Sequence, residues 1–178
     1  ERIDDIAPTY HIEGPNFAAI NNSEKSLMPS HSKIVTDITD STYTNDLSFN
    51  SLRIIRTNQS QGYVSIHFSQ IQLWIDGKNV ALSKNGTIAS DNGNKPDGNG
   101  VLRKSDFLIN NNLNDHWHTI DANTYASMYA LLRLNNSYLL KSIQSIVLYG
   151  RYQNGSFMQI SDNVGISVQL INTIPAAS

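Results

Sequence analysis

A strand and a tight turn follow one another in Gln70-Ile-Gln-Leu-Trp-Ile-Asp76 and Gly77-Lys-Asn-Val-Ala-Leu82. Ile71, Leu73 and Ile75 recur with a period of two, which places them on one face of a β-strand, opposite the glutamines and the tryptophan. The Asp-Gly pair favours the positive φ angles of a hairpin turn. The stretch therefore predicts a strand with one dry face, a two-residue turn and a return strand.

Other short segments of the chain also combine an apolar run typical of a strand with residues typical of a turn. Residues 125–134 fit both helical and strand spacing, but Asn135-Asn-Ser137 is a turn signal with another apolar run directly after it. An antiparallel pair of strands is the more economical interpretation there. Short strands, long polar loops and no convincing helix predict an all-β fold, an antiparallel β-sandwich. The further strands are expected at Ser51 to Thr57, Tyr63 to Phe68, Ser142 to Tyr149 and Gly165 to Ile171.

The composition of the 178 residues agrees with a turn-rich β protein. Charged residues make up only 16%, while Asn and Ser occur 21 times each, and both residues hydrogen-bond locally in turns. The net charge of −2 implies no general attraction to nucleic acid or to anionic lipid. The chain has no cysteine for a disulfide framework and no apolar run long enough for a membrane span.

Two segments do not have this pattern of short strands and turns. Residues 1–48 combine isolated apolar residues with three prolines, and we interpret them as an extended N-terminal arm ahead of a sandwich domain at residues 49–178. The arm is either a flexible leader or a segment that lies along its own domain or a neighbouring subunit. Residues 84–104 are rich in Gly, Asn and Asp, with Asn85-Gly86, Asn92-Gly93 and Asp97-Gly98 in quick succession, which predicts a long surface loop.

Several segments, in order, carry a family resemblance. They are Arg53 to Thr57, His67 to Leu82, Leu108 to Thr119, Tyr129 to Arg151 and Gly165 to Asn172. Together they resemble the discoidin or coagulation-factor C-type domains, and most of all the variant found in proteins of large DNA viruses. The resemblance implies a galactose-binding-like jelly-roll sandwich and leaves the arm outside the match.

The chain departs from the family pattern at carboxylates. Gln70 and Asn110 stand where the family has acidic residues, and the family strand with Glu and Asp becomes Leu131-Leu-Arg-Leu134. Family members often hold a structural Ca²⁺ in the loop that corresponds to Asn110, Asn112 and Asp115. Because Ca²⁺ prefers anionic oxygen ligands, the exchange at Asn110 is expected to weaken such a site, with Asp115 compensating in part. No other cofactor is implied.

The most distinctive local motif is His116-Trp117-His118. Residues two apart on a strand share a face, so the two imidazoles could bind a transition metal together. No third ligand is visible in the sequence, however, and the stronger interpretation is a pair without metal.

The same motif is a better candidate for contacting a glycan. Sugar sites combine an aromatic face with a few orienting donors and acceptors, and His116, Trp117, His118, Arg151 and Tyr152 supply these types. In the alternative interpretation Trp117 is a core or loop-filling aromatic, and Arg151 holds a loop through hydrogen bonds. The recognition pattern of fucose-binding relatives is not present, so no sugar specificity follows.

Catalytic signatures and nucleic-acid-binding patterns are missing from the sequence. There is no Cys nucleophile, G-x-S-x-G, H-E-x-x-H or P-loop, and the basic residues are dispersed without interleaved aromatics. Pairs of carboxylates such as Asp91 with Asp97 lie in polar segments and are expected to be solvated. Five Asn-x-Ser/Thr sequons fall in predicted turns, and their number is also compatible with chance in an Asn- and Ser-rich chain. They are Asn21, Asn58, Asn85, Asn135 and Asn154.

The sequence therefore predicts a non-catalytic structural or binding protein. The resemblance implies a capsid- or virion-surface-associated component of a large DNA virus, located on the virion or another extracellular surface. Its partners would be capsid or other virion proteins, contacted through residues 1–48. The alternative is a lectin-like module that binds carbohydrate through the end loops of the sandwich.

Overall fold

The computed structural model describes residues 10–13, 25–26, 33–34, 48–56, 65–119, 128–157 and 166–171. Every pairing between strands in these ranges is antiparallel. The helical turns in the same ranges are 3₁₀ segments at Ser83–Asn85 (η4), Ser105–Ile109 (η5) and Leu140–Ser142 (η7). None of the helices described is long and apolar enough to cross a membrane.

The first sheet is centred on β10 and β5. Its strand order is β1-β10-β5-β6, and β8 pairs with the beginning of β5. The strands are β1 (Tyr10–Glu13), β10 (Ile143–Gly150), β5 (His67–Ile75), β6 (Lys78–Asn79) and β8 (Trp117–His118).

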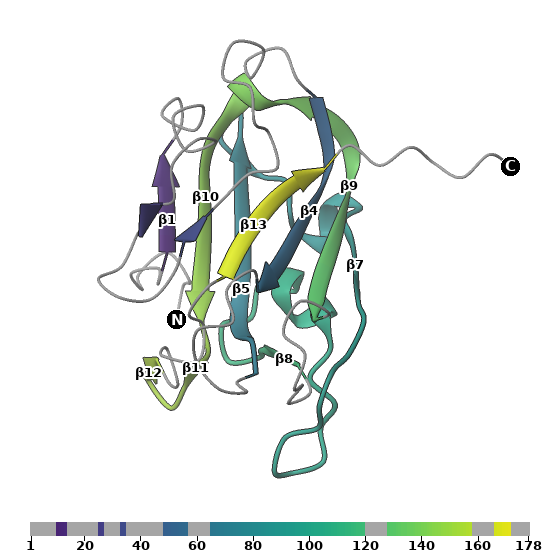
Figure 1. The fold of residues 1–178 in the computed structure, drawn as a ribbon, viewed down its shortest axis with the longest axis vertical. Coiled ribbons are helices and arrows are strands. Elements are labelled where there is room, and N and C mark those ends of the chain that lie inside the picture. The colour runs from purple at the N-terminus through teal and green to yellow at the C-terminus, as the bar shows by residue number, and fades with distance from the viewer. Residues whose placement is uncertain are drawn as a thin grey trace, which may run out of the picture.

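The second sheet has the order β13-β4-β9-β7, and in Figure 1 β13 crosses in front of β5 with β4, β9 and β7 to its right. Its strands are β13 (Ile166–Ile171), β4 (Ser48–Arg56), β9 (Tyr129–Leu139) and β7 (Ile88–Asp91). Two further pairs of short strands form two-stranded sheets of their own. They are β2 (Lys25–Ser26) with β3 (Lys33–Ile34), and β11 (Tyr152–Gln153) with β12 (Ser156–Phe157).

One hydrophobic core fills the space between the two sheets. Alternate residues of β5 and β10 face alternate residues of β4, β9 and β13 within a single buried cluster. This is the packing of a β-sandwich, and it confirms the predicted all-β sandwich. The fully buried members with the largest side chains include Trp117, Phe49, Phe68, Leu52 and Ile54.

The hairpin predicted at Asp76-Gly77 is confirmed. Asp76 and Gly77 have φ angles of 50° and 71° and connect β5 to β6, as in a two-residue turn that requires positive φ at both positions. Ile71, Leu73 and Ile75 face the core as predicted. The opposite face of β5 is covered as well, because Gln72 is buried and Trp74 packs against Leu113, Val147, Tyr149 and Tyr152.

A β-bulge lies near the beginning of β5. Tyr149 is opposite Gln70 while the next residue, Gly150, is opposite Phe68, so Ser69 is an extra residue on β5. The extra residue reverses the alternation, which lets Phe68 and Ile71 both face the core although they are three residues apart. Ser69 Oγ accepts a hydrogen bond from the Tyr152 backbone N–H at 2.9 Å. The bulge therefore fixes the chain where β10 ends.

The ambiguous segment at residues 125–134 is a strand in its described part. Ala130, Leu132 and Leu134 are buried in the core and Met128 packs against it, which is the period of two that we favoured. The turn predicted at Asn135-Asn-Ser137 was wrong, because β9 continues to Leu139 and the chain turns at η7. These polar residues are exposed and form an irregularity in the strand, because Arg133 is opposite Ser51 while the next pair is Tyr138 with Phe49.

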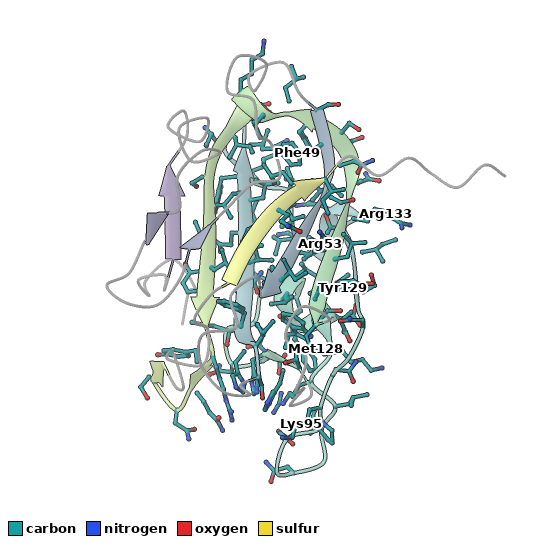
Figure 2. The ribbon with its side chains drawn as sticks, in the orientation of Figure 1. Phe49, Arg53, Lys95, Met128, Tyr129 and Arg133 are labelled. Atoms are coloured by element: carbon teal, nitrogen blue, oxygen red, sulfur yellow. The ribbon has the colours of Figure 1, made fainter. Side chains whose placement is uncertain are left out.

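The predicted surface loop at residues 84–104 contains an element that we missed. Residues 88–91 form β7, an edge strand that pairs with β9, and the loop proper begins at Asn92. Figure 2 shows Lys95 on this loop, below Met128 and Tyr129. An exposed edge strand buries little apolar surface, so hydrophobic periodicity gives almost no signal for it.

Parts of the expected N-terminal arm belong to the sandwich. β1 pairs with β10 along the edge of the first sheet, and β3 lies against β13 of the second sheet. Apart from β1, β2 and β3, residues 1–47 lie outside the described residues, as do the sequons at Asn21 and Asn58. Of the other sequons, Asn154 lies in the turn between β11 and β12, Asn85 ends η4, and Asn135 lies in β9.

Candidate functional site

Three histidines from two distant segments meet where β5 begins and β8 ends. His67 is opposite His118 in the β5-β8 pairing, and their ring centroids are 3.9 Å apart. His116 lies two residues earlier, with its ring centroid 6.1 Å from that of His118. We call His67, His116 and His118 the histidine cluster. It lies at the end of the sandwich where β8, β11 and the loop after β7 gather in Figure 1, which we call the loop end.

His67 could not be recognised from the sequence as part of this cluster. His67 and His118 are far apart in the chain and become neighbours only through the strand register. Paired residues in antiparallel strands share a face of the sheet, so the pairs His67-His118 and Phe68-Trp117 point to opposite sides. To identify His67 from the sequence, one would have to predict that β5 pairs with β8 and in which register.

The histidine cluster does not form a recognisable metal site. Within the described ranges, no group of three or more His, Cys, Asp or Glu side chains has an arrangement that could hold a metal ion. His67 is therefore a third imidazole in the neighbourhood of His116 and His118, and it does not complete a set of metal ligands with them.

His116 is the most unusual titratable residue at the loop end. Its side chain is 2% exposed, and neither ring nitrogen has a hydrogen-bond partner among the described residues. Burial, with smaller contributions from the charges of Arg151, Arg103 and His118, lowers the pKa of His116 to about 3, while Asp97 opposes the shift. His116 is therefore neutral at physiological pH, with one donor and one acceptor on its ring.

The structure places Trp117 in the core. Its side chain is fully buried in the cluster between the sheets, so its ring does not offer a face to a sugar. This agrees with the alternative interpretation of Trp117 as a core aromatic. Aromatic stacking by Trp117, as we expected for a glycan site, is not available in this arrangement.

Arg151 and Tyr152 follow β10 but have different surroundings. The Arg151 guanidinium donates through Nη2 to Gln153 Oε1 at 2.9 Å, and its charge is close enough to lower the pKa of His116. Tyr152 is buried against Val147, Tyr149 and Leu113 on the outer side of the first sheet. Arg151 is thus associated with the histidine cluster, whereas Tyr152 is part of a satellite apolar cluster.

Arg103 fixes the loop after β7 against β8. It forms an ion pair with Asp97, lies 3.7 Å from Asp115 Oδ1 and covers the ring of Phe107. The hydrogen bond from Arg103 is the main reason that the pKa of Asp97 is lowered. The backbone is joined as well, because the His118 N–H donates to the Arg103 carbonyl at 3.1 Å.

The carboxylates of Asp91 and Asp97 are not simply solvated, and that prediction was wrong. Asp91 Oδ2 accepts the Ser105 backbone N–H at 2.9 Å, and Oδ1 accepts Asn94 Nδ2 at 2.9 Å. Asp97 Oδ1 accepts the backbone N–H groups of Asn99 and Val101, both at 2.9 Å. Both residues organise the loop because a short carboxylate can satisfy backbone donors that have no strand partner.

The loop at Asn110, Asn112 and Asp115, expected from the resemblance to be a weakened Ca²⁺ site, is closed by side-chain amides. Asn110 Nδ2 and Asn112 Nδ2 both donate to Asp115 Oδ2, at 2.8 and 2.9 Å. The two amide oxygens accept backbone N–H groups, Asn110 Oδ1 from Asn112 and Asn112 Oδ1 from Asn114. The oxygens that a cation would need are therefore already engaged: the amides donate to Asp115 Oδ2, and the Arg103 guanidinium lies beside Asp115 Oδ1.

Substitution of Asn110 by Asp tests this closure. Asn110→Asp keeps the oxygen that accepts the Asn112 N–H but replaces the donor to Asp115 by a second negative charge. We expect a loss of about 1–2 kcal/mol in the free energy of unfolding, measured by urea denaturation. Ca²⁺ should leave the melting temperature of the original chain unchanged.

Asn114→Asp is the matched control, because it adds the same charge to the same exposed loop at a side chain outside the bonds to Asp115. It should leave the stability within about 0.5 kcal/mol. A rise in the melting temperature of the original chain with millimolar Ca²⁺ would show that the loop binds the ion and would contradict this account.

Comparisons with known proteins do not assign the chain to a family. No protein-family model matches it. Neither the curated proteins nor the solved structures contain a match. The functional argument therefore depends on the geometry of the loop end.

Proposed function

We propose that the chain is a non-catalytic binding protein built on a discoidin-like jelly-roll sandwich, and that its loop end binds a hydroxyl-bearing ligand of the carbohydrate class. The observation that carries this proposal is the buried, neutral ring of His116. Its two nitrogens have no hydrogen-bond partner among the described residues. A buried polar group left in this state costs about 1–3 kcal/mol, so a partner that satisfies it has a clear energetic advantage.

The chemistry of a neutral imidazole favours hydroxyl groups over a simple anion. The ring has one N–H donor and one acceptor nitrogen, and adjacent hydroxyl groups of a sugar can satisfy both at once. Arg103 and Arg151 add guanidinium donors near the ring. Because Trp117 is in the core, recognition would depend on hydrogen bonds rather than on aromatic stacking. Entry of the ligand requires the side chains that cover His116 to move.

A glycan array with the original chain and His116→Phe tests the proposal. We expect the original chain to bind at least one glycan and His116→Phe to bind it at least tenfold more weakly, because the phenyl ring fills the same space without donor or acceptor. The measurement is array intensity followed by calorimetric titration of the bound glycan. Loss of a hydrogen bond to a buried polar group commonly changes affinity by this much or more.

Ile88→Ala is the control for this experiment, since Ile88 is exposed on β7 and belongs to the other sheet. It should bind as the original chain does, and thermal melting should show that both variants are folded. Absence of binding to every glycan, or unchanged affinity in His116→Phe, would contradict a carbohydrate site at the loop end.

A structural role at a virion surface is the second candidate function. It is favoured by the placement of β1 on β10 and of β3 against β13, which shows that segments before Ser48 pack on sheet edges. We propose that residues 1–48 could contact capsid or other virion proteins in the same manner. Copurification of the chain with a capsid protein, lost when residues 1–47 are removed, would support this role.

A further inference from the structure

Strand β1 occupies the outer edge of the first sheet. Its four residues pair with β10 in a continuous antiparallel register, from Tyr10 opposite Leu148 to Glu13 opposite Ser145. In the strand order of this sheet β1 comes last on that side, and β10 is its neighbour. A strand of this length contributes only a few backbone hydrogen bonds, each with a net value of about 0.5–1.5 kcal/mol.

The edge of β10 needs such a partner. Ile146, Val147, Leu148 and Tyr149 are consecutive buried residues of β10. An apolar strand with open N–H and C=O groups is a template for pairing with other chains, and proteins normally cover it. Residues 10–13 can cover the edge of β10 with the same backbone hydrogen bonds whether they belong to the same chain or to another copy.

The connection after β1 permits either arrangement. Residues 14–24 separate β1 from the β2-β3 hairpin, and β3 lies against β13 of the other sheet. A segment of this length spans up to roughly 35 Å when extended, which is enough to reach a neighbouring domain while β3 stays in place. Exchange of an identical element between copies needs no new interface chemistry.

We propose that the edge of β10 is a docking site for residues 10–13 of a second copy, so that neighbouring copies exchange β1. The exchange does not depend on the carbohydrate proposal. The two arrangements share the same contacts, so their ratio depends on concentration. The connection keeps β1 of the same chain at an effective concentration in the millimolar range, so the exchanged fraction rises as the concentration of copies approaches that range.

Mixed single-cysteine chains test the exchange directly, because the natural sequence contains no cysteine. One full-length chain carries Glu13→Cys and a second, of different tag length, carries Ser145→Cys, at positions that are opposite in the β1-β10 register. The two are refolded together from urea at about 0.5 mM and oxidised. We expect a disulfide-linked heterodimer on a non-reducing gel, in at least fivefold excess over the control mixture.

In the control mixture, Glu13→Cys is paired with Ser90→Cys, an exposed position on β7 in the other sheet. A single chain with both Glu13→Cys and Ser145→Cys reports pairing within one copy. Heterodimer no more abundant than in the control, together with an intramolecular disulfide in the double variant, would overturn the exchange. Failure of the double variant to cross-link as well would overturn the pairing of β1 itself.

Discussion

Replacement of Trp117 by alanine should lower the free energy of unfolding by about 3–5 kcal/mol. Trp117 is fully buried, is opposite Phe68 in the β5-β8 pairing and belongs to the cluster between the sheets. Removal of its ring leaves a cavity that β8, with only two residues, is poorly placed to fill. Because small domains are stable by about 5–15 kcal/mol in total, the variant should unfold at a much lower urea concentration.

Ile88→Ala provides the comparison for Trp117→Ala, since the Ile88 side chain is 66% exposed and its truncation should cost no more than about 0.5 kcal/mol. A Trp117→Ala variant as stable as the original chain would contradict the core position of the indole. The expected result also means that loss of ligand binding in Trp117→Ala would report damage to the fold rather than a lost sugar contact.

Acidification should destabilise the protein through His116. The pKa of His116 is lowered to about 3 in the folded protein, against about 6.5 in the unfolded chain. The unfolded state therefore binds more protons between these values, and the contribution of neutral His116 to stability is complete above pH 6.5 and is lost as the pH falls toward 3. At pH 5 this amounts to about 2 kcal/mol, measurable by urea denaturation as a function of pH.

His116→Gln separates this contribution from other titrations, because glutamine is polar but does not ionise. The groups that act on His116 are Arg151, Arg103, His118 and Asp97, with His67 beside His118, and the variant retains all of them. We expect its stability to fall less between pH 7 and pH 5 than that of the original chain. Equal slopes in the two proteins would show that His116 is not held neutral by its surroundings.

The sequence predicted the strands whose periodicity and turn chemistry agree. Ile71, Leu73 and Ile75 alternate with polar residues and are followed by Asp-Gly, and both the buried face and the turn were correct. In β9, burial of Ala130, Leu132 and Leu134 confirmed a strand over a helix. The polar residues after Leu134 do interrupt the pairing of β9 with β4, which passes from Arg133-Ser51 to Tyr138-Phe49, but pairing resumes beyond them and the chain turns only at η7.

The loop end was only partly predictable because its contacts are non-local. His116 and His118 were chosen from their own motif, but His67 joins them through the β5-β8 register. A tryptophan in the sequence is compatible with a place in the core and with stacking on a sugar. Only the burial of Trp117 in the structure distinguishes these roles. The amide closure at Asp115 likewise depends on the orientations of Asn110 and Asn112, which composition does not reveal.

The most direct test of a carbohydrate site is an imidazole NMR titration. Two-dimensional ¹⁵N spectra of the histidine rings would be recorded at pH 7 with each glycan that the array retains. The account predicts that His116 has the pattern of a neutral imidazole before addition and that its two ring-nitrogen signals shift on binding. A bound glycan that leaves the His116 signals unchanged would contradict it.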